Sequence, residues 1–245
     1  MNNERFNLSQ RAGAYYMRWS RAERIQHWIL ALSFLVLVIT GFALRYPDTW
    51  WVRPFTGYEW LFNLRGVVHR IAGASLILLG LYHVTYLAVT ARGRLQIAAL
   101  RPRLQDVRQA LQNLRYNLGA SEQKPKFGHY SYFEKVEYWA LVWGTMVMGT
   151  TGLMLWFFSS TLRLFPRWVI DLATVIHLYE AWLASLAIVV WHFYYVVFNP
   201  DVYPLDSSML NGLINEEELL DGHAAEWEAL QKQPSEPRVP TPDCG

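Results

Sequence analysis

Four long apolar segments alternate with polar segments along the chain. They cover residues 25–44, 64–90, 136–158 and 168–200. Each is long enough to cross a bilayer as a helix, which takes about 20 apolar residues. A single helix satisfies its own backbone hydrogen bonds inside lipid, which an isolated strand does not. The pattern therefore predicts an all-α fold, an integral membrane four-helix bundle surrounded by membrane lipid.

The polar segments divide the chain into three parts. We expect a basic arm over 1–24, a four-span membrane domain over 25–200 and an acidic tail over 201–245 with a disordered end. Basic side chains gather in the arm and in the connection between the second and third spans. Because cytoplasmic loops carry an excess of Lys and Arg, both segments are expected in the cytoplasm. Four spans then place both termini on the cytoplasmic side of the membrane.

Composition narrows the class of protein. The chain is 53% hydrophobic and contains 12 Trp, which suits a membrane protein. Its formal net charge of +2 gives no case for a nucleic-acid partner. Cys244 is the only cysteine, which excludes an intrachain disulfide, covalent c-type haem attachment and an iron–sulfur cluster held by this chain alone.

Histidines occur in pairs on the second and fourth apolar segments. His69 and His83 are fourteen positions apart, and His177 and His192 are fifteen apart. On an α-helix each pair points within about 60° of one direction and spans about 21–22 Å. Each helix would then carry one histidine near either membrane surface. Paired imidazoles are standard axial ligands for haem iron in electron-transfer proteins.

The topology sorts these histidines by depth. His69 and His177 lie at the outer surface, while His83 and His192 lie at the inner surface together with His27 of the first segment. We therefore expect two b-type haems between the helices, or three if the surplus histidine also ligates. His27 and His83 remain alternatives at the inner site. A lone membrane histidine can also face a polar cavity or a neighbouring helix, and a protein whose histidines only pack would be a non-redox membrane anchor.

Four further features could belong to such a site. Arg70 and Arg65 could pair with haem propionates, or be ordinary interfacial arginines. Glu180 is a costly carboxylate within a span, for which we expect a structural partner. Small residues on the histidine side of the second segment could admit a flat macrocycle or let helices pack closely. These are Gly66, Gly73 and Gly80.

The segment 127–138 opens the third span with polar and aromatic side chains. It could line a quinone headgroup pocket and supply protons, or form an interfacial aromatic belt with solvated charges. In the tail, we expect His223 to be exposed to solvent. The residues of the segment concerned are His129, Tyr132, Glu134, Lys135 and Glu137.

The chain resembles the bacterial di-haem cytochrome b subunits of formate dehydrogenases, nickel–iron hydrogenases and thiosulfate reductases. Residues 24–28 (RIQHW) and 40–42 (TGF) are similar to the first helix of that family. Residues 69–73 (HRIAG) resemble the ligand motif of its second helix, and His177 and His192 resemble the two ligands of its last helix. Residues 130–156 and 192–204 resemble a subgroup associated with multihaem c-type cytochromes.

The resemblance implies ligands and partners. The outer haem would be held by His69 and His177, and the inner haem by His27 and His192; His83 departs from the common pattern. A quinone would bind beside the inner haem, and an iron–sulfur or multihaem c-type cytochrome subunit would exchange electrons at the outer surface.

The expected function is electron transfer across the membrane between the quinone pool and a redox partner on the outer side. The chain would be a subunit of an oxidoreductase complex rather than a complete enzyme. A self-contained quinone or metal reductase is the alternative within the redox class, and the non-redox membrane anchor is the alternative outside it.

Overall fold

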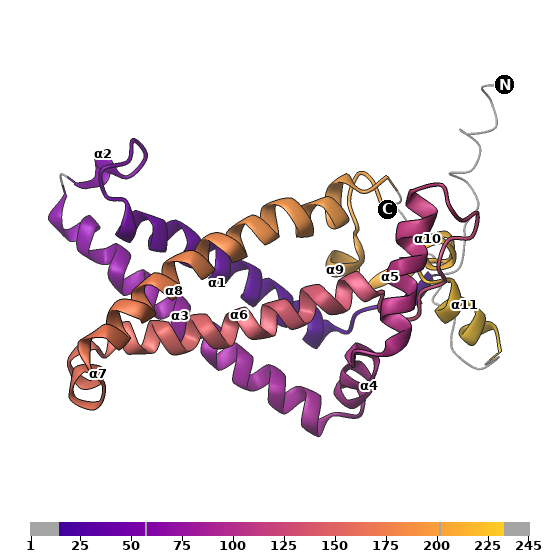
Figure 1. The fold of residues 1–245 in the computed structure, drawn as a ribbon, viewed down its shortest axis with the longest axis horizontal. Coiled ribbons are helices and arrows are strands. Elements are labelled where there is room, and N and C mark those ends of the chain that lie inside the picture. The colour runs from indigo at the N-terminus through magenta and orange to yellow at the C-terminus, as the bar shows by residue number, and fades with distance from the viewer. Residues whose placement is uncertain (1–14, 57, 201, 233–245) are drawn as a thin grey trace. The chain divides into compact units, whose positions relative to one another are not determined.

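The structure is a computed structural model that describes residues 15–56, 58–200 and 202–232 (Figure 1). Cys244 and the expected disordered end of the tail lie outside these residues. Most of the described chain is helical, and the exceptions in regular structure are two three-residue strands, β1 (Tyr15–Met17) and β2 (Leu213–Asn215). The helices are α1 (Arg21–Arg45), α2 (Arg53–Thr56), α3 (Glu59–Val89), α4 (Ala91–Leu100), α5 (Leu104–Asn117), α6 (Tyr132–Trp156), α7 (Phe158–Leu164), α8 (Arg167–Leu186), α9 (Ser208–Asn211), α10 (Glu216–Gly222) and α11 (Ala224–Gln231).

Three helices are long and apolar enough to cross a membrane. They are α1, α3 and the continuous helix Arg167–Phe198, which begins as α8. A fourth candidate is the pair α6 and α7, which is bent by 96° where the two helices meet. The prediction of an all-α membrane protein is therefore confirmed, with three spans or four if the bent pair crosses as one.

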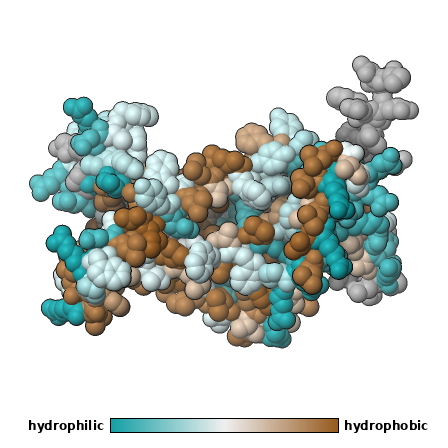
Figure 2. Space-filling view, viewed as in Figure 1, coloured by the Kyte–Doolittle hydropathy of each residue, from teal (hydrophilic) through white to brown (hydrophobic). Residues whose placement is uncertain are grey.

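The spanning helices are apolar on the outside and partly polar within. Most of their large apolar side chains are exposed, as the brown areas of Figure 2 illustrate. The side chains that α1 buries include Gln26 and Ser33, and Ser33 donates a hydrogen bond to Ser75 of α3 at 3.3 Å. Small and polar residues at helix contacts with apolar residues outside are typical of proteins that sit in lipid.

The described residues form two compact units. The first, here called the spanning unit, consists of Ile25–Ala98 and Val136–Tyr194. Within it, Phe42 of α1 packs on Trp182 of α8 with ring centroids 4.5 Å apart. A Cβ atom on Gly149 of α6 would lie 3.8 Å from Ile77 of α3, so these two helices are also in contact.

The second unit, here called the polar unit, consists of the described parts of Met1–Arg24, Ala99–Lys135 and Tyr195–Gly245. In it β1 pairs antiparallel with β2, and Tyr16 lies opposite Ile214. The strand pair joins the arm before the first span to the tail after the last one. The sequence suggested three separate polar segments, and the structure gathers them into one unit.

The last span changes its helical form before it ends. After α8, residues Ala187–His192 and Tyr194–Phe198 are π-helical. A π-helix has i→i+5 hydrogen bonds and therefore advances fewer degrees per residue than an α-helix. Consequently, the direction of His192 relative to His177 does not follow from α-helical spacing alone.

Candidate functional site

His69 of α3 and His177 of α8 face each other within the spanning unit. Their ring centroids are 6.4 Å apart and their planes meet at 70°. The Nδ1 atom of His69 lies 2.9 Å from Oγ1 of Thr40, and Nδ1 of His177 lies 2.9 Å from Oγ1 of Thr151. Two helices that precede these histidines in the chain, α1 and α6, thus orient one ring each in the same way.

The two threonines also fix which ring nitrogen carries the proton. Each hydroxyl donates to the carbonyl four residues earlier, Thr40 to Val36 at 2.6 Å and Thr151 to Val147 at 2.7 Å. The hydroxyl oxygen is then left to accept the proton of Nδ1. This tautomer leaves Nε2 of each imidazole with a free lone pair, the form that ligates a metal.

A glycine follows each of these threonines and packs against the same ring. A Cβ atom on Gly41 would lie 3.1 Å from Cε1 of His69, and one on Gly152 would lie 3.3 Å from Cε1 of His177. Each Thr-Gly pair, here called a Thr-Gly cradle, therefore holds one imidazole. Sequence reasoning missed this role. The signal available was the same dipeptide at 40–41 and 151–152, once in the first and once in the third apolar segment.

The three glycines expected from the sequence do not make close contacts with the histidine rings. A Cβ atom on Gly66 or Gly73 would meet a leucine at 4.0 Å or 3.9 Å, which is ordinary contact. A Cβ atom on Gly80 would meet nothing within 4 Å. The close approaches to histidine rings come from Gly41 and Gly152 instead.

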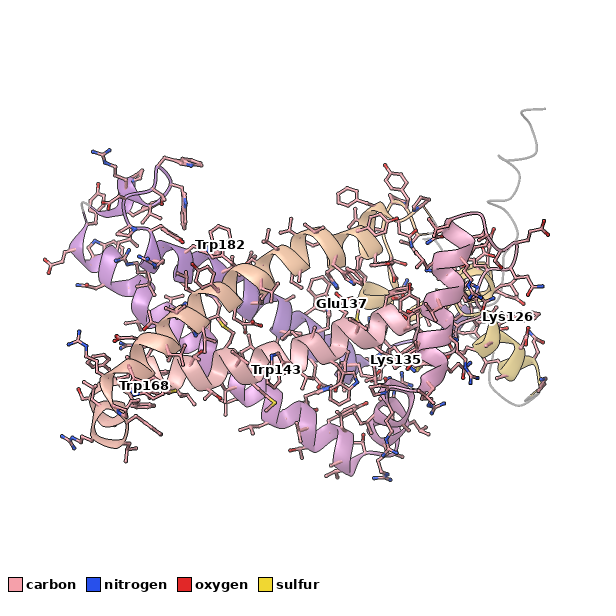
Figure 3. All side chains as sticks on the ribbon, in the orientation of Figure 1. Lys126, Lys135, Glu137, Trp143, Trp168 and Trp182 are labelled. Carbon is pink, nitrogen blue, oxygen red and sulfur yellow. The ribbon has the colours of Figure 1, made fainter. Side chains whose placement is uncertain are left out.

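A second histidine pair joins His27 of α1 to His192 of the last span. Their ring centroids are 6.3 Å apart and their planes meet at 34°. Nδ1 of His192 donates to Oε1 of Glu137 on α6 at 2.6 Å; Glu137 is labelled in Figure 3. Nδ1 of His27 is buried and has no hydrogen-bond partner among the described residues. The structure therefore brings together His27 and His192, with Nε2 of His192 left with its lone pair.

His83 makes a different set of contacts. Its Nδ1 donates to Oε1 of Gln26 at 2.8 Å, and its Nε2 accepts from the hydroxyl of Tyr138 at 3.1 Å. Both ring nitrogens of His83 thus form hydrogen bonds to protein groups. In this arrangement the Nε2 lone pair is not available to ligate a metal. Gln26 lies in the RIQHW motif and Tyr138 ends the segment 127–138, but the sequence did not predict that either contacts His83.

Three charged residues of the spanning helices, Arg65, Arg70 and Glu180, differ in the groups that they contact. The guanidinium carbon of Arg70 lies 5.7 Å from the ring centroid of Trp156, a cation–π contact, and Arg65 donates to the carbonyl of Ala43 at 2.5 Å. Glu180 is half-buried, and its Oε1 lies 2.9 Å from the position that a Cβ atom on Gly144 would take. The partner expected for Glu180 is not found among the described residues.

Part of the polar segment 127–138 belongs to a cluster of partly buried charged side chains, whereas its Glu137 contacts His192 in the spanning unit. Arg18 is only 4% exposed and pairs with Glu134 at 3.3 Å and with Glu226 at 2.9 Å. His129 contacts Glu226 at 2.5 Å, and His223 donates to the carbonyl of Gly128 at 2.7 Å. These five charged or titratable side chains, here called the Arg18 cluster, tie together the arm, the connection before α6 and the tail.

Burial of the Arg18 cluster corrects the expectation that His223 is exposed. Burial and the neighbouring Arg18 lower the pKa of His223 from its ordinary value of 6.5. Burial alone would raise the pKa of Glu226, but the hydrogen bond from His129 and the charges of His129 and Arg18 hold that pKa below its ordinary value of 4.5. In the same unit, Lys135 pairs with Asp106 of α5 at 2.7 Å, so it is not a solvated charge either.

Several helices long and apolar enough to span a lipid bilayer indicate that this chain is a membrane protein. It belongs to the prokaryotic cytochrome b561 family, whose sequence profile matches residues 18–212. The resemblance stated from the sequence is thereby confirmed. Membership implies b-type haem as the cofactor and electron transfer as the role.

Individual relatives agree with the family. The chain is 25% identical over 173 residues to the formate dehydrogenase cytochrome b556 subunit of Haemophilus influenzae, a match that covers 70% of this chain and 66% of that protein. It is 22% identical over 184 residues to the formate dehydrogenase cytochrome b556(fdo) subunit of Escherichia coli, covering 73% of this chain and 77% of the relative. The chain thus spans about two thirds of the length of the first relative.

The histidine pairs suit haem iron. Two imidazoles on opposite sides of one metal ion, each bonded at about 2 Å, have ring centroids about 6 Å apart. The separations of 6.4 Å and 6.3 Å agree with that value. No group of three or more His, Cys, Asp or Glu residues that could hold a bare metal ion occurs in the described part of the chain. Two imidazoles per site would suit a haem iron, whose macrocycle would supply the other ligands.

Proposed function

We propose that this chain is a di-haem b-type cytochrome subunit that carries electrons across the membrane between the quinone pool and a redox partner on the outer side. Helices α1, α3, α6 and α8 would cross the bilayer as a four-helix bundle, with the haems between them. Relatives named as formate dehydrogenase subunits support a place in an oxidoreductase complex. The partner would be an iron–sulfur or multihaem c-type cytochrome subunit.

The observation that carries this proposal is the equal separation of two histidine pairs. His69 and His177 would ligate the outer iron, and His27 and His192 the inner iron. When bound, haem supplies one-electron chemistry. The chain's own residues set the ring tautomers through Thr40, Thr151 and Glu137, and the apolar helices exclude water from the sites.

We assign His83 to the quinone side of the inner site rather than to iron. Its neighbours support this, because Gln26 adjoins His27 in sequence and Tyr138 adjoins Glu137, the partner of His192. A quinone headgroup is recognised through its two oxygens. His83 and Tyr138 would contact it by exchanging the hydrogen bond between them for one to a quinone oxygen. Two haems, rather than three, follow from this assignment.

The proposed location is the bacterial inner membrane, with both termini in the cytoplasm. The basic arm and the basic connection after the second span support this orientation. Reporter fusions after Gly245 and within the 50–58 loop should report opposite sides. The same side for both would contradict the four-span arrangement.

Haem content per mole of purified chain tests the central proposal. We expect two haems by pyridine haemochrome assay and one haem after H177Q or H192Q, because each substitution removes an axial ligand. H27Q should also leave one haem, whereas the matched substitution H83Q should leave two. One haem or none in the native chain would contradict the two-site arrangement, and loss of the inner haem in H83Q but not in H27Q would reverse the assignment at that site.

Two further measurements separate the alternatives. A reduced-minus-oxidised spectrum without haem bands would favour a non-redox membrane anchor, against the family membership. Isolation from the native membrane distinguishes a subunit from a self-contained quinone or metal reductase. Co-purification with an iron–sulfur or multihaem protein is the expected result, and quinol-dependent substrate reduction by the chain alone would contradict the subunit role.

A further inference from the structure

Helix α5 exposes the side that a soluble protein would bury. Five large apolar residues recur along it and its last turn with spacings of three and four. At 100° per residue they fall within an arc of about 80° on the helix surface. All five are exposed, Leu104 by 80% and Leu118 by 74%. This apolar stripe consists of Leu104, Val107, Leu111, Leu114 and Leu118.

The opposite side of α5 is polar and faces the protein. Gln109 is buried and donates to the carbonyl of Lys126 at 2.9 Å. Asn113 donates to the hydroxyl of Tyr132 at 3.0 Å, and Asp106 pairs with Lys135 at 2.7 Å. The orientation of α5 is thus fixed by hydrogen bonds and an ion pair, and the apolar stripe points away from the unit that holds it.

The contacts of α5 tie it to the start of a spanning helix. Tyr132 and Lys135 belong to the first turn of α6, which continues into the apolar segment after Val136. In sequence, α5 follows the end of α3 at Val89 by way of the ten-residue helix α4, about 15 Å long. In the sequence, α5 is therefore connected on both sides to segments that adjoin spanning helices.

Positively charged side chains border the apolar stripe and indicate which kind of surface the stripe binds. Arg108 and Arg115 are exposed and lie within about 40° of Leu104 on the helical wheel. Figure 2 shows hydrophobic side chains along α5 next to hydrophilic ones. An apolar stripe bordered by Arg is the pattern of helices that lie in the lipid headgroup region, because the apolar side chains enter the acyl boundary and the guanidinium groups meet anionic headgroups.

We propose that α5 is an interfacial helix that lies on the anionic phospholipid surface of the same membrane. Its stripe is covered by lipid, and Arg108 and Arg115 bind phosphate groups. A protein partner would also bury leucines, but it does not by itself call for cations along the border of the stripe. The role of α5 is independent of haem ligation and quinone binding.

Single-cysteine spin labelling of the full chain tests this proposal. Replacing the one cysteine (C244S) gives the background for two variants, L111C on the stripe and Q105C about 120° away. The chain is placed in nanodiscs of phosphatidylcholine with phosphatidylglycerol, and the collision rates of each label with oxygen and with a water-soluble nickel chelate are measured. Circular dichroism verifies that both variants keep their helical content.

We expect the L111C label to collide severalfold more with oxygen and severalfold less with the nickel chelate than the Q105C label. In nanodiscs of phosphatidylcholine alone, or after R108Q together with R115Q, nickel collisions at L111C should rise. Equal nickel collisions at both labels in every lipid would overturn the proposal, because the stripe would then face water. Low collision rates with both reagents at L111C would also overturn it and would indicate a protein cover, with dipolar coupling between labels identifying a second copy.

Discussion

Glu137 and His192 form a carboxylate–imidazole pair with Oε1 and Nδ1 2.6 Å apart. A carboxylate that accepts the Nδ1 proton makes the other nitrogen a more basic ligand. A more basic axial ligand stabilises the oxidised form of an iron centre and lowers its reduction potential. If His192 ligates the proposed inner haem, Glu137 would lower the reduction potential of that haem.

The substitution E137Q should raise the reduction potential of the inner haem and leave the outer one unchanged. A tenfold shift in the ratio of oxidised to reduced form corresponds to about 59 mV for one electron, and we expect a rise of that order. Potentiometric titration of the haem bands measures both potentials. E134Q serves as a control at a nearby carboxylate that contacts Arg18 instead; an equal rise in both variants would contradict a specific effect through His192.

Removing the hydroxyl groups of the Thr-Gly cradles should weaken the outer haem only. In T40V or T151V the buried Nδ1 proton loses its acceptor, a cost of about 1–3 kcal/mol. We expect both variants to lose outer haem more readily in a chelation or competition assay, and T40S and T151S to restore retention. Loss of the inner haem in either variant would show that the effect is a general loss of folding.

The cradle glycines should tolerate no side chain without displacing a ring. A methyl group at position 41 or 152 would stand 3.1 Å or 3.3 Å from the imidazole, so G41A and G152A should broaden or shift the low-spin signal of the outer haem. G80A is the matched control, because nothing lies within 4 Å of its Cβ position. Electron paramagnetic resonance makes the comparison, and an unchanged signal in G41A and G152A would contradict the role of the cradles.

The Arg18 cluster should loosen on acidification. His223 has a lowered pKa when folded, so the unfolded chain binds the proton first and stability falls as the pH drops below about 6.5. Glu226 also has a lowered pKa, so its contribution is full above 4.5 and is lost at lower pH. The hydrogen-exchange protection of residues 15–20 and 223–231, corrected for the intrinsic pH dependence of amide exchange, should therefore fall between pH 7.5 and pH 5. The variant H223N should flatten this dependence above pH 5; an unchanged profile would exclude His223 as its source.

The apolar pattern was enough to predict the membrane fold, because a bilayer leaves a chain few options besides helices of spanning length. It was also enough to pair His69 with His177, since both occur near the same ends of their segments. The bend between α6 and α7 lies close to residue 158, where the third apolar segment ends, but the short helix α7 after the bend was not predicted from its polar sequence.

The inner histidine pair could not be assigned from residue spacing alone. Extrapolation from His177 to His192 assumes α-helical geometry, but residues Ala187–His192 are π-helical. The resemblance suggested His27, and the spacing suggested His83. Their contacts differ in a way that spacing does not encode, because Gln26 and Tyr138 engage both nitrogens of His83.

The Arg18 cluster was beyond sequence reasoning for another reason. Arg18 and Glu226 are separated by 208 positions, and no periodic pattern links an arm to a tail at that distance. Solvated charge was the natural expectation for each of these polar segments. Only the pairing of β1 with β2 and the burial of Arg18 show that they depend on one another.

The matching Thr-Gly cradles have a consequence for how the chain is held together. One half of the chain supplies Thr40, Gly41 and His69, and the other half supplies Thr151, Gly152 and His177. An iron bound between these histidines would therefore cross-link the two halves of the polypeptide, each of which supplies one histidine and one of the Thr-Gly cradles. A chain cut between α5 and α6 would keep both of these residue sets intact, and the bound iron would hold the two fragments together.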